Sequence, residues 1–166
     1  MTSFHDLYVQ YAPAVRRFAL FVSGDAALAD DLAAETFVRA FVAVGEVRGS
    51  VRSWLLAIAH NLFREELRKR RPSAPMDPAL ADPAAAPDAL AEGREELRRT
   101  LRALQRLPET DRAALVLRAV EELSHEEIAA ALGLSPIAAR VRVYRARARL
   151  TDLMKKEKRT WTSPVT

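Results

Sequence analysis

Apolar residues recur every three or four positions along most of the chain, and this spacing predicts helices rather than strands. Before Pro72 the pattern forms three helical segments: residues 4–22, residues 26–44, and a third that begins after residue 49 and ends in the basic run 68–71. Pro13 predicts a kink in the first segment or a break into two short helices. Ser50 or Ser53 can cap the third segment.

The composition changes between Pro72 and Gly93. This stretch holds five prolines and four acids and has no basic residue. Because it cannot bury enough apolar surface to order itself, it predicts a flexible, acidic linker rich in proline and alanine. We therefore expect an all-α chain of two small helical domains that move independently when the chain is free. A leucine stripe begins the second domain near Arg94, and Pro108 begins its next helix.

Residues 123–153 have the pattern of two short helices joined by a tight turn. Ser124 precedes an apolar run and Glu127 follows three residues later, which predicts a capping box. Gly133 is typical of a helix end, because glycine adopts the left-handed conformation at little cost. Ser135 and Pro136 begin the second helix as N-cap and first helical residue. This is the helix-turn-helix pattern, whose second helix enters the major groove of DNA.

The second helix of this motif is strongly basic. Nine lysines or arginines and two acids lie between Ser135 and Arg159, which favours contact with the phosphates of a duplex. A solvated basic helix in a bundle is the alternative interpretation. On a helical wheel one side, expected to face the core, holds Ala139, Val143, Ala146 and Leu150. The opposite side, expected to face the groove, is apolar and holds Ile137, Val141, Tyr144 and Ala148.

The composition bears on disulfides, metal sites, membrane insertion and enzymatic activity. The 166 residues carry a net charge of +4 and include no cysteine, which excludes disulfides and thiolate metal sites and fits a cytoplasmic protein. No apolar run is long enough for a transmembrane helix, so membrane insertion is not expected. The histidines are scattered, and His125 lacks the second histidine of a zinc-protease helix. We expect no catalytic residues, no metal site, no cofactor and no enzymatic activity.

Several stretches together resemble the extracytoplasmic-function sigma factors, the small two-domain members of the sigma-70 family that give bacterial RNA polymerase its promoter specificity. The resemblance covers nearly all of the chain. It rests on ADDLAAETFVRAF (29–41), VRSWLLAIAHNLFREELRKRR (51–71) and LQRLPETDRAALVLRAVEELSHEEIAAALGLS (104–135), in that order and with a linker between the second and third.

For the first domain the resemblance implies binding to the beta-prime clamp helices of core RNA polymerase and opening of the minus-ten promoter element. The polymerase-binding candidates are Asp30, Asp31, Glu35, Phe37 and Arg39. An ordinary solvated face with a buried Phe37 is the alternative. The candidates for the downstream element are Arg48, Ser50, Arg52, His60, Asn61, Arg64 and Arg68. Cationic tracking of phosphates and capture of unstacked bases suit these residue types.

For the second domain the resemblance implies binding to the polymerase beta flap and to the minus-thirty-five element as duplex DNA. The candidate residues are Ser135, Pro136, Ile137, Arg140, Val141, Arg142, Tyr144, Arg145 and Arg147. The family tends to have the sequence Thr-Val-Lys-Ser-Arg near the start of this helix. The matching residues of this chain are Ala138, Ala139, Arg140, Val141 and Arg142, so the centre of the DNA-facing side is unusually apolar. The apolar centre either contacts thymine methyl groups or docks a protein such as an anti-sigma factor.

The expected organisation is a first domain over residues 1–71, a linker over 72–93, a second domain over 94–156 and a tail over 157–166. By resemblance the linker threads the RNA path of the polymerase, with a solvated spacer as the alternative. The predicted function is that of an alternative sigma factor, which directs promoter recognition, melting and transcription initiation. Two alternatives stay open: a sigma-like protein that acts only by protein contacts, and a stand-alone helix-turn-helix regulator.

Overall fold

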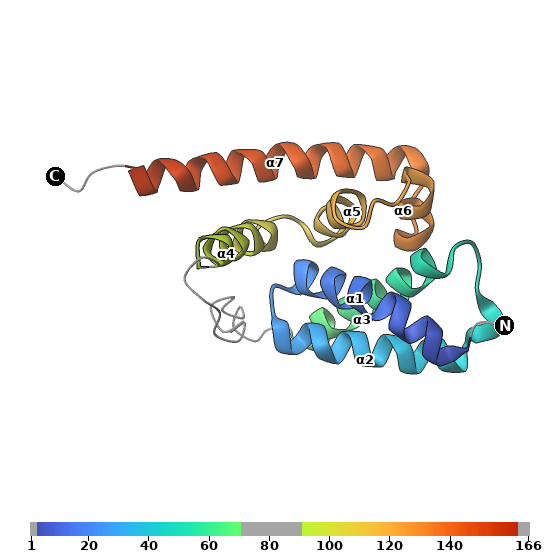
Figure 1. Ribbon diagram of the computed structural model, residues 1–166. Helices are drawn as coiled ribbons and strands as arrows, with labels where there is room; N and C mark the ends of the chain where they lie inside the picture. The colour runs from blue at the N-terminus through green and yellow to red at the C-terminus, as the bar shows by residue number, and fades with distance from the viewer. Residues whose placement is uncertain (1–2, 71–90, 163–166) are drawn as a thin grey trace.

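The structure is a computed structural model that describes residues 3–70 and 91–162. The described residues are helical throughout apart from their connections, which confirms the predicted all-α fold of two helical domains joined through a linker region (Figure 1). The elements are α1 (Phe4–Ser23), α2 (Ala26–Val42), the short 3₁₀ helix η1 (Val44–Glu46), α3 (Val51–Lys69), α4 (Ala91–Gln105), α5 (Glu109–Ala119), α6 (His125–Leu132) and α7 (Pro136–Thr162).

The first domain is a bundle of α1, α2 and α3. α1 is one continuous helix that contains Pro13, so the predicted break into two short helices is not found. Pro13 is exposed, and so is Val9, whose carbonyl would otherwise accept the missing proline N–H. Solvent can therefore satisfy that carbonyl, which makes the proline tolerable in this helix. Ser50, rather than Ser53, is the N-cap of α3 and accepts a hydrogen bond from the Ser53 N–H.

The second domain is formed by α4 to α7, and Figure 1 shows α7 lying across α4, α5 and α6. α4 begins at Ala91, before the expected start of the domain, and α7 continues to Thr162, into the segment expected to be a tail. The predicted linker falls almost entirely outside the described residues, and with it the expectation that it threads an RNA path.

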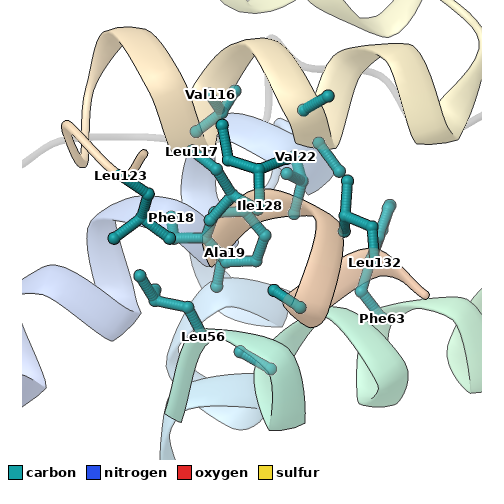
Figure 2. Packing of buried hydrophobic residues seen from close by; sticks show 14 of the residues in the cluster. Phe18, Ala19, Val22, Leu56, Phe63, Val116, Leu117, Leu123, Ile128 and Leu132 are labelled. Carbon is teal, nitrogen blue, oxygen red and sulfur yellow. The ribbon is translucent and has the colours of Figure 1, made fainter. Parts of the chain in front are cut away.

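The two domains share one hydrophobic core, which contradicts the expectation that they are independent. Figure 2 shows Phe18 of α1 and Leu56 of α3 pointing toward Leu117 of α5 and Ile128 of α6. Each of these four side chains is fully buried. An apolar helical period is compatible with burial inside a domain or between domains, so the sequence pattern alone does not show which of the two occurs.

Candidate nucleic-acid interface

The helix-turn-helix forms as its capping residues predict. The Ser124 hydroxyl accepts a hydrogen bond from the Glu127 N–H at 3.1 Å, and the Glu127 carboxylate accepts one from the Ser124 N–H at the same distance. Gly133 ends α6 with a left-handed φ of 68°. A Cβ on Gly133 would meet nothing within 4 Å, so the backbone conformation alone explains the glycine. Ser135 caps α7 by accepting from the Ala138 N–H.

The two sides of α7 are arranged as the helical wheel predicts. Ala139, Val143 and Ala146 are buried against the domain. On the opposite side Ile137 is 78% exposed, Val141 51% and Tyr144 77%. These large apolar side chains each leave at least half of their surface exposed, so this face is available to a ligand.

The four arginines of α7 that are candidates for DNA contact fall into two groups. Arg142 and Arg145 both donate to the Asp111 carboxylate of α5, at 2.9 Å and 3.2 Å respectively. Asp111 is 3% exposed, so its charge holds these guanidinium groups against the domain. Arg140 and Arg147 are exposed and form no ion pair with any acid of the described chain. Their charges are therefore the ones best placed to meet phosphate, together with the exposed helix start at Ser135 and Pro136.

The sequence identified Asp111 only as an acid in the first turn of a helix. Its pairing with arginines 31 and 34 residues away depends on how α5 packs on α7. No local signal marks such a contact.

Four of the seven downstream candidates contact acids of the second domain, and of these four only His60 is buried. Arg52 of α3 lies 2.5 Å from the Glu121 carboxylate, and His60 Nε2 lies 2.5 Å from Glu109 Oε1. Ser50 donates a hydrogen bond to Glu127 at 3.2 Å, and Arg64 lies 4.0 Å from Glu109. The remaining candidates, Arg48, Asn61 and Arg68, are exposed.

The electrostatics of this contact favour ionised carboxylates. Burial raises the pKa of Glu109, but the hydrogen bond with His60 and the nearby charges outweigh it, so the pKa lies below its ordinary value. The hydrogen bond from the Ser124 backbone lowers the pKa of Glu127, and its bonds from the Ser124 and Ser50 hydroxyls add to the effect. The acids of the second domain therefore present negative charge to α3.

Four of the polymerase-binding candidates, Asp30, Asp31, Glu35 and Arg39, lie on the exposed face of α2. Asp30 pairs with Arg16 of α1 at 2.6 Å, and Arg39 pairs with Glu65 of α3 at 3.1 Å. Phe37 is different, since it is 4% exposed and its ring packs edge-on against the Tyr8 ring at 4.9 Å. The structure thus gives Phe37 a place in the core, in line with the alternative interpretation of this face.

Two further features of the described residues concern membranes and metal ions. In residues 3–70 and 91–162, no helix is both long and apolar enough to cross a membrane. The same ranges bring together no group of three potential metal ligands among His, Asp and Glu.

The chain matches two family models. The model for sigma-70 region 2 matches residues 7–72, and the model for sigma-70 region 4 matches residues 97–150. Among curated proteins, it is 37% identical over 158 residues to the RNA polymerase sigma factor CarQ of Myxococcus xanthus, which covers 92% of this chain and 89% of the relative. It is 33% identical over 158 residues to the sigma factor EcfG of Rhodopseudomonas palustris, covering 92% and 85%.

A solved structure extends the likeness to three dimensions. The sigma factor RpoE of Bartonella quintana, solved in complex with the anti-sigma factor NepR, superposes with a TM-score of 0.77 at 28% identity and covers 93% of this chain and 98% of that chain. Both predicted domains thus have counterparts of the same order and fold. The chain belongs to the sigma-70 family and is an alternative sigma factor of the extracytoplasmic-function group, which directs transcription initiation.

Proposed function

We propose that this chain binds core RNA polymerase and directs it to promoters read at two elements, one by each domain. The first domain comprises α1 to α3, and the second comprises α4 to α7. The helix-turn-helix of the second domain reads the upstream, minus-thirty-five element as duplex. The observation that carries this assignment is the outer face of α7, where exposed Arg140 and Arg147 flank an exposed apolar centre.

Within that face, the arginines and the apolar residues contact different parts of the DNA. Arg140 and Arg147 contact phosphate or guanine, and Val141 and Ile137 contact thymine methyl groups. Arg142 and Arg145 can reach DNA only at the edge of the helix, because Asp111 holds them. Family likeness also supports an anti-sigma factor as a partner, since RpoE was solved with one.

The first domain supplies the polymerase contact and opens the downstream element. Asp30, Asp31, Glu35 and Arg39 form an exposed, mainly acidic surface on α2 that suits the basic beta-prime clamp helices, while the second domain meets the beta flap. Asn61 and Arg68 contact the melted strand. The α3 candidates Arg52, His60 and Arg64, which lie beside acids of the second domain, contact it as well. The chain itself supplies binding and strand separation in the cytoplasm, and catalysis belongs to the polymerase.

Run-off transcription on a random-promoter library, with purified core RNA polymerase and this chain, tests the proposal. Sequence-selective transcripts that share two spaced elements are the expected result. Polymerase binding without transcripts would favour a protein that acts only by contacts. Absence of polymerase binding, with retained binding to duplex DNA, would favour a stand-alone DNA-binding regulator.

Removing the two exposed arginines of α7 is expected to weaken upstream binding. In an Arg140→Ala/Arg147→Ala variant, loss of two phosphate contacts should lower the slope of log affinity against log salt by about 2 and the affinity by about tenfold or more. Fluorescence anisotropy with a duplex carrying the selected upstream element measures both. Arg106→Ala, which removes an exposed charge outside α7, is the control and should leave the slope unchanged. An unchanged slope in the double variant would exclude these residues from the contact.

A further inference from the structure

The edge of α7 that holds Arg142 and Arg145 is built around one buried carboxylate of α5. Asp111 is 3% exposed, and Arg142 Nη1 donates to its Oδ1 at 2.9 Å. Arg145 donates to both carboxylate oxygens, from Nε to Oδ2 at 3.2 Å and from Nη2 to Oδ1 at 3.3 Å. A single acid of the second domain therefore binds two guanidinium groups of its basic helix.

Asp111 reduces what this edge of the helix can offer to DNA. Two guanidinium ions and one carboxylate together have a single net positive charge. Arg145 uses Nε and Nη2 for the acid, and these two donors form the planar fork that suits a phosphate or a guanine. Because a carboxylate and a phosphate compete for the same guanidinium, this edge attracts a duplex less strongly than its two arginines would suggest.

The bonds to Asp111 should persist when a duplex binds. The Asp111 side chain is 5% exposed, so water has little access to replace a guanidinium that leaves. Departure of both arginines would leave a buried carboxylate without a partner, which is strongly unfavourable. The side chains of Arg142 and Arg145 are 34% and 59% exposed, so they remain at the surface while the acid sets their position.

The opposite edge of α7 has no such acid, since Arg140 and Arg147 form no ion pair within the described chain. Attraction to phosphate supplies essentially all of the sequence-independent affinity of a protein for duplex DNA. Four unrestrained arginines on this helix would therefore strengthen binding to any duplex. Specificity is a difference between affinities, so restraint of one edge favours selective binding through the other edge and the apolar centre.

We infer that Asp111 is a positioning residue for promoter specificity, which holds Arg142 and Arg145 and thereby restrains sequence-independent binding of α7 to duplex DNA. The inference rests on the proposed binding of α7 to the upstream element. Without the acid, the two freed side chains can reach the phosphates of any duplex. The selected element gains less, because base contacts of Ile137 and Val141 already fix the helix in one register.

An Asp111→Asn variant of the full chain tests the inference, because asparagine keeps the shape of the side chain and removes its charge. Fluorescence anisotropy at several salt concentrations measures binding to two duplexes, one with the selected upstream element and one of unrelated sequence. For the unrelated duplex, the slope of log affinity against log salt should steepen by up to about 2 and the affinity should rise about tenfold. The ratio of the two affinities should fall. A merely structural role would lower both affinities without steepening the slope.

Two further variants show whether freed arginines cause the gain. Asp152→Asn makes the same change of charge on α7, but Asp152 is exposed and has no ion pair within residues 3–70 and 91–162, so the slope should stay near that of the unaltered chain. Asp111→Asn/Arg142→Gln/Arg145→Gln removes the arginines together with the acid and should abolish the gain. Circular dichroism verifies the fold of each variant. Equal effects of the two asparagine variants, or a gain that survives the triple substitution, would overturn the inference.

Should Asp111→Asn fail to fold, Arg145→Gln decides, because Asp111 then keeps its bond with Arg142. This substitution should lower the slope by much less than the value of about 1 that loss of a phosphate contact gives. A fall of about 1 would show that Arg145 already binds phosphate and is not restrained.

The Arg140→Ala/Arg147→Ala variant separates this result from the proposed function. An unchanged slope in that variant would overturn the assignment of α7 to the upstream element. A lowered slope there, combined with an unchanged slope for Asp111→Asn, would overturn only the role of Asp111.

Discussion

Replacing Arg112 by alanine is expected to lower the free energy of unfolding by about 3–5 kcal/mol, because it removes a buried guanidinium that several carbonyls require. Arg112 is 8% exposed and has no carboxylate partner in the described structure. Its four hydrogen bonds go to backbone carbonyls, those of Leu104, Val22, Gln105 and Leu107.

These four bonds join parts of the molecule that lie far apart in sequence. The Val22 carbonyl belongs to the last turn of α1, where helical carbonyls have no partner within the helix. The other three belong to the end of α4 and the turn before α5. Desolvation by burial lowers the pKa of Arg112, and the Glu109 charge opposes the shift. The carbonyl dipoles thus take the place of water around a charged side chain.

Urea denaturation followed by circular dichroism measures the effect of the Arg112→Ala substitution. Arg112→Lys keeps the charge but loses the planar fork, so an intermediate loss is expected. Arg118→Ala is the control, because Arg118 is an exposed arginine of the same helix that donates only to the Leu123 carbonyl. A loss at Arg112 no larger than at Arg118 would mean that water satisfies the four carbonyls equally well.

A Phe18→Ala substitution is expected to cost about 3–5 kcal/mol and to destabilise both domains together. The Phe18 ring is 0% exposed, and Figure 2 shows it among side chains from both domains, near Leu117 and Ile128. Truncation leaves a cavity at the centre of the shared core, so neither domain can relax without the other.

Two probes distinguish a shared core from separate ones. In a Trp161→Phe background, Trp54 fluorescence reports on α3, and far-ultraviolet circular dichroism reports on all helices. Both denaturation midpoints should fall together in the Phe18→Ala variant. Phe41→Ala deletes the same atoms from a ring that is 64% exposed and contacts the Phe4 ring, so it should cost about 1 kcal/mol. A transition that separates into two steps would show that the domains unfold independently.

Local chemistry made much of the fold predictable. The Ser124 capping box, the end of α6 at Gly133 and the start of α7 at Ser135 depend on residues three or four apart, so the sequence contains both partners of each interaction. The same holds for the faces of α7, because its period places Ala139 inward and Val141 outward whatever the rest of the chain does. Where local rules mislead, as at Pro13, the outcome depends on whether solvent reaches the freed carbonyl.

The candidate site was predictable as a set of residues but not as a surface. Resemblance pointed to Arg52, His60 and Arg64 as DNA contacts, and nothing in the residues themselves indicates that acids of the second domain lie beside them. Arg17 and Glu121 are 104 residues apart, and His60 and Glu109 are 49 apart. A pair at such separation forms only when the packing of whole helices brings it together.

By itself, therefore, the sequence determined the helices, their caps, the order of the two domains and the family, all of which follow from neighbours along the chain. Tertiary structure alone decided that the domains share a core, that Phe37 is buried and that α3 faces the acids of the second domain. The physical reason is that hydrophobic burial is non-directional. Periodicity specifies which face of a helix is buried, whereas shape and charge across the contact select its partner.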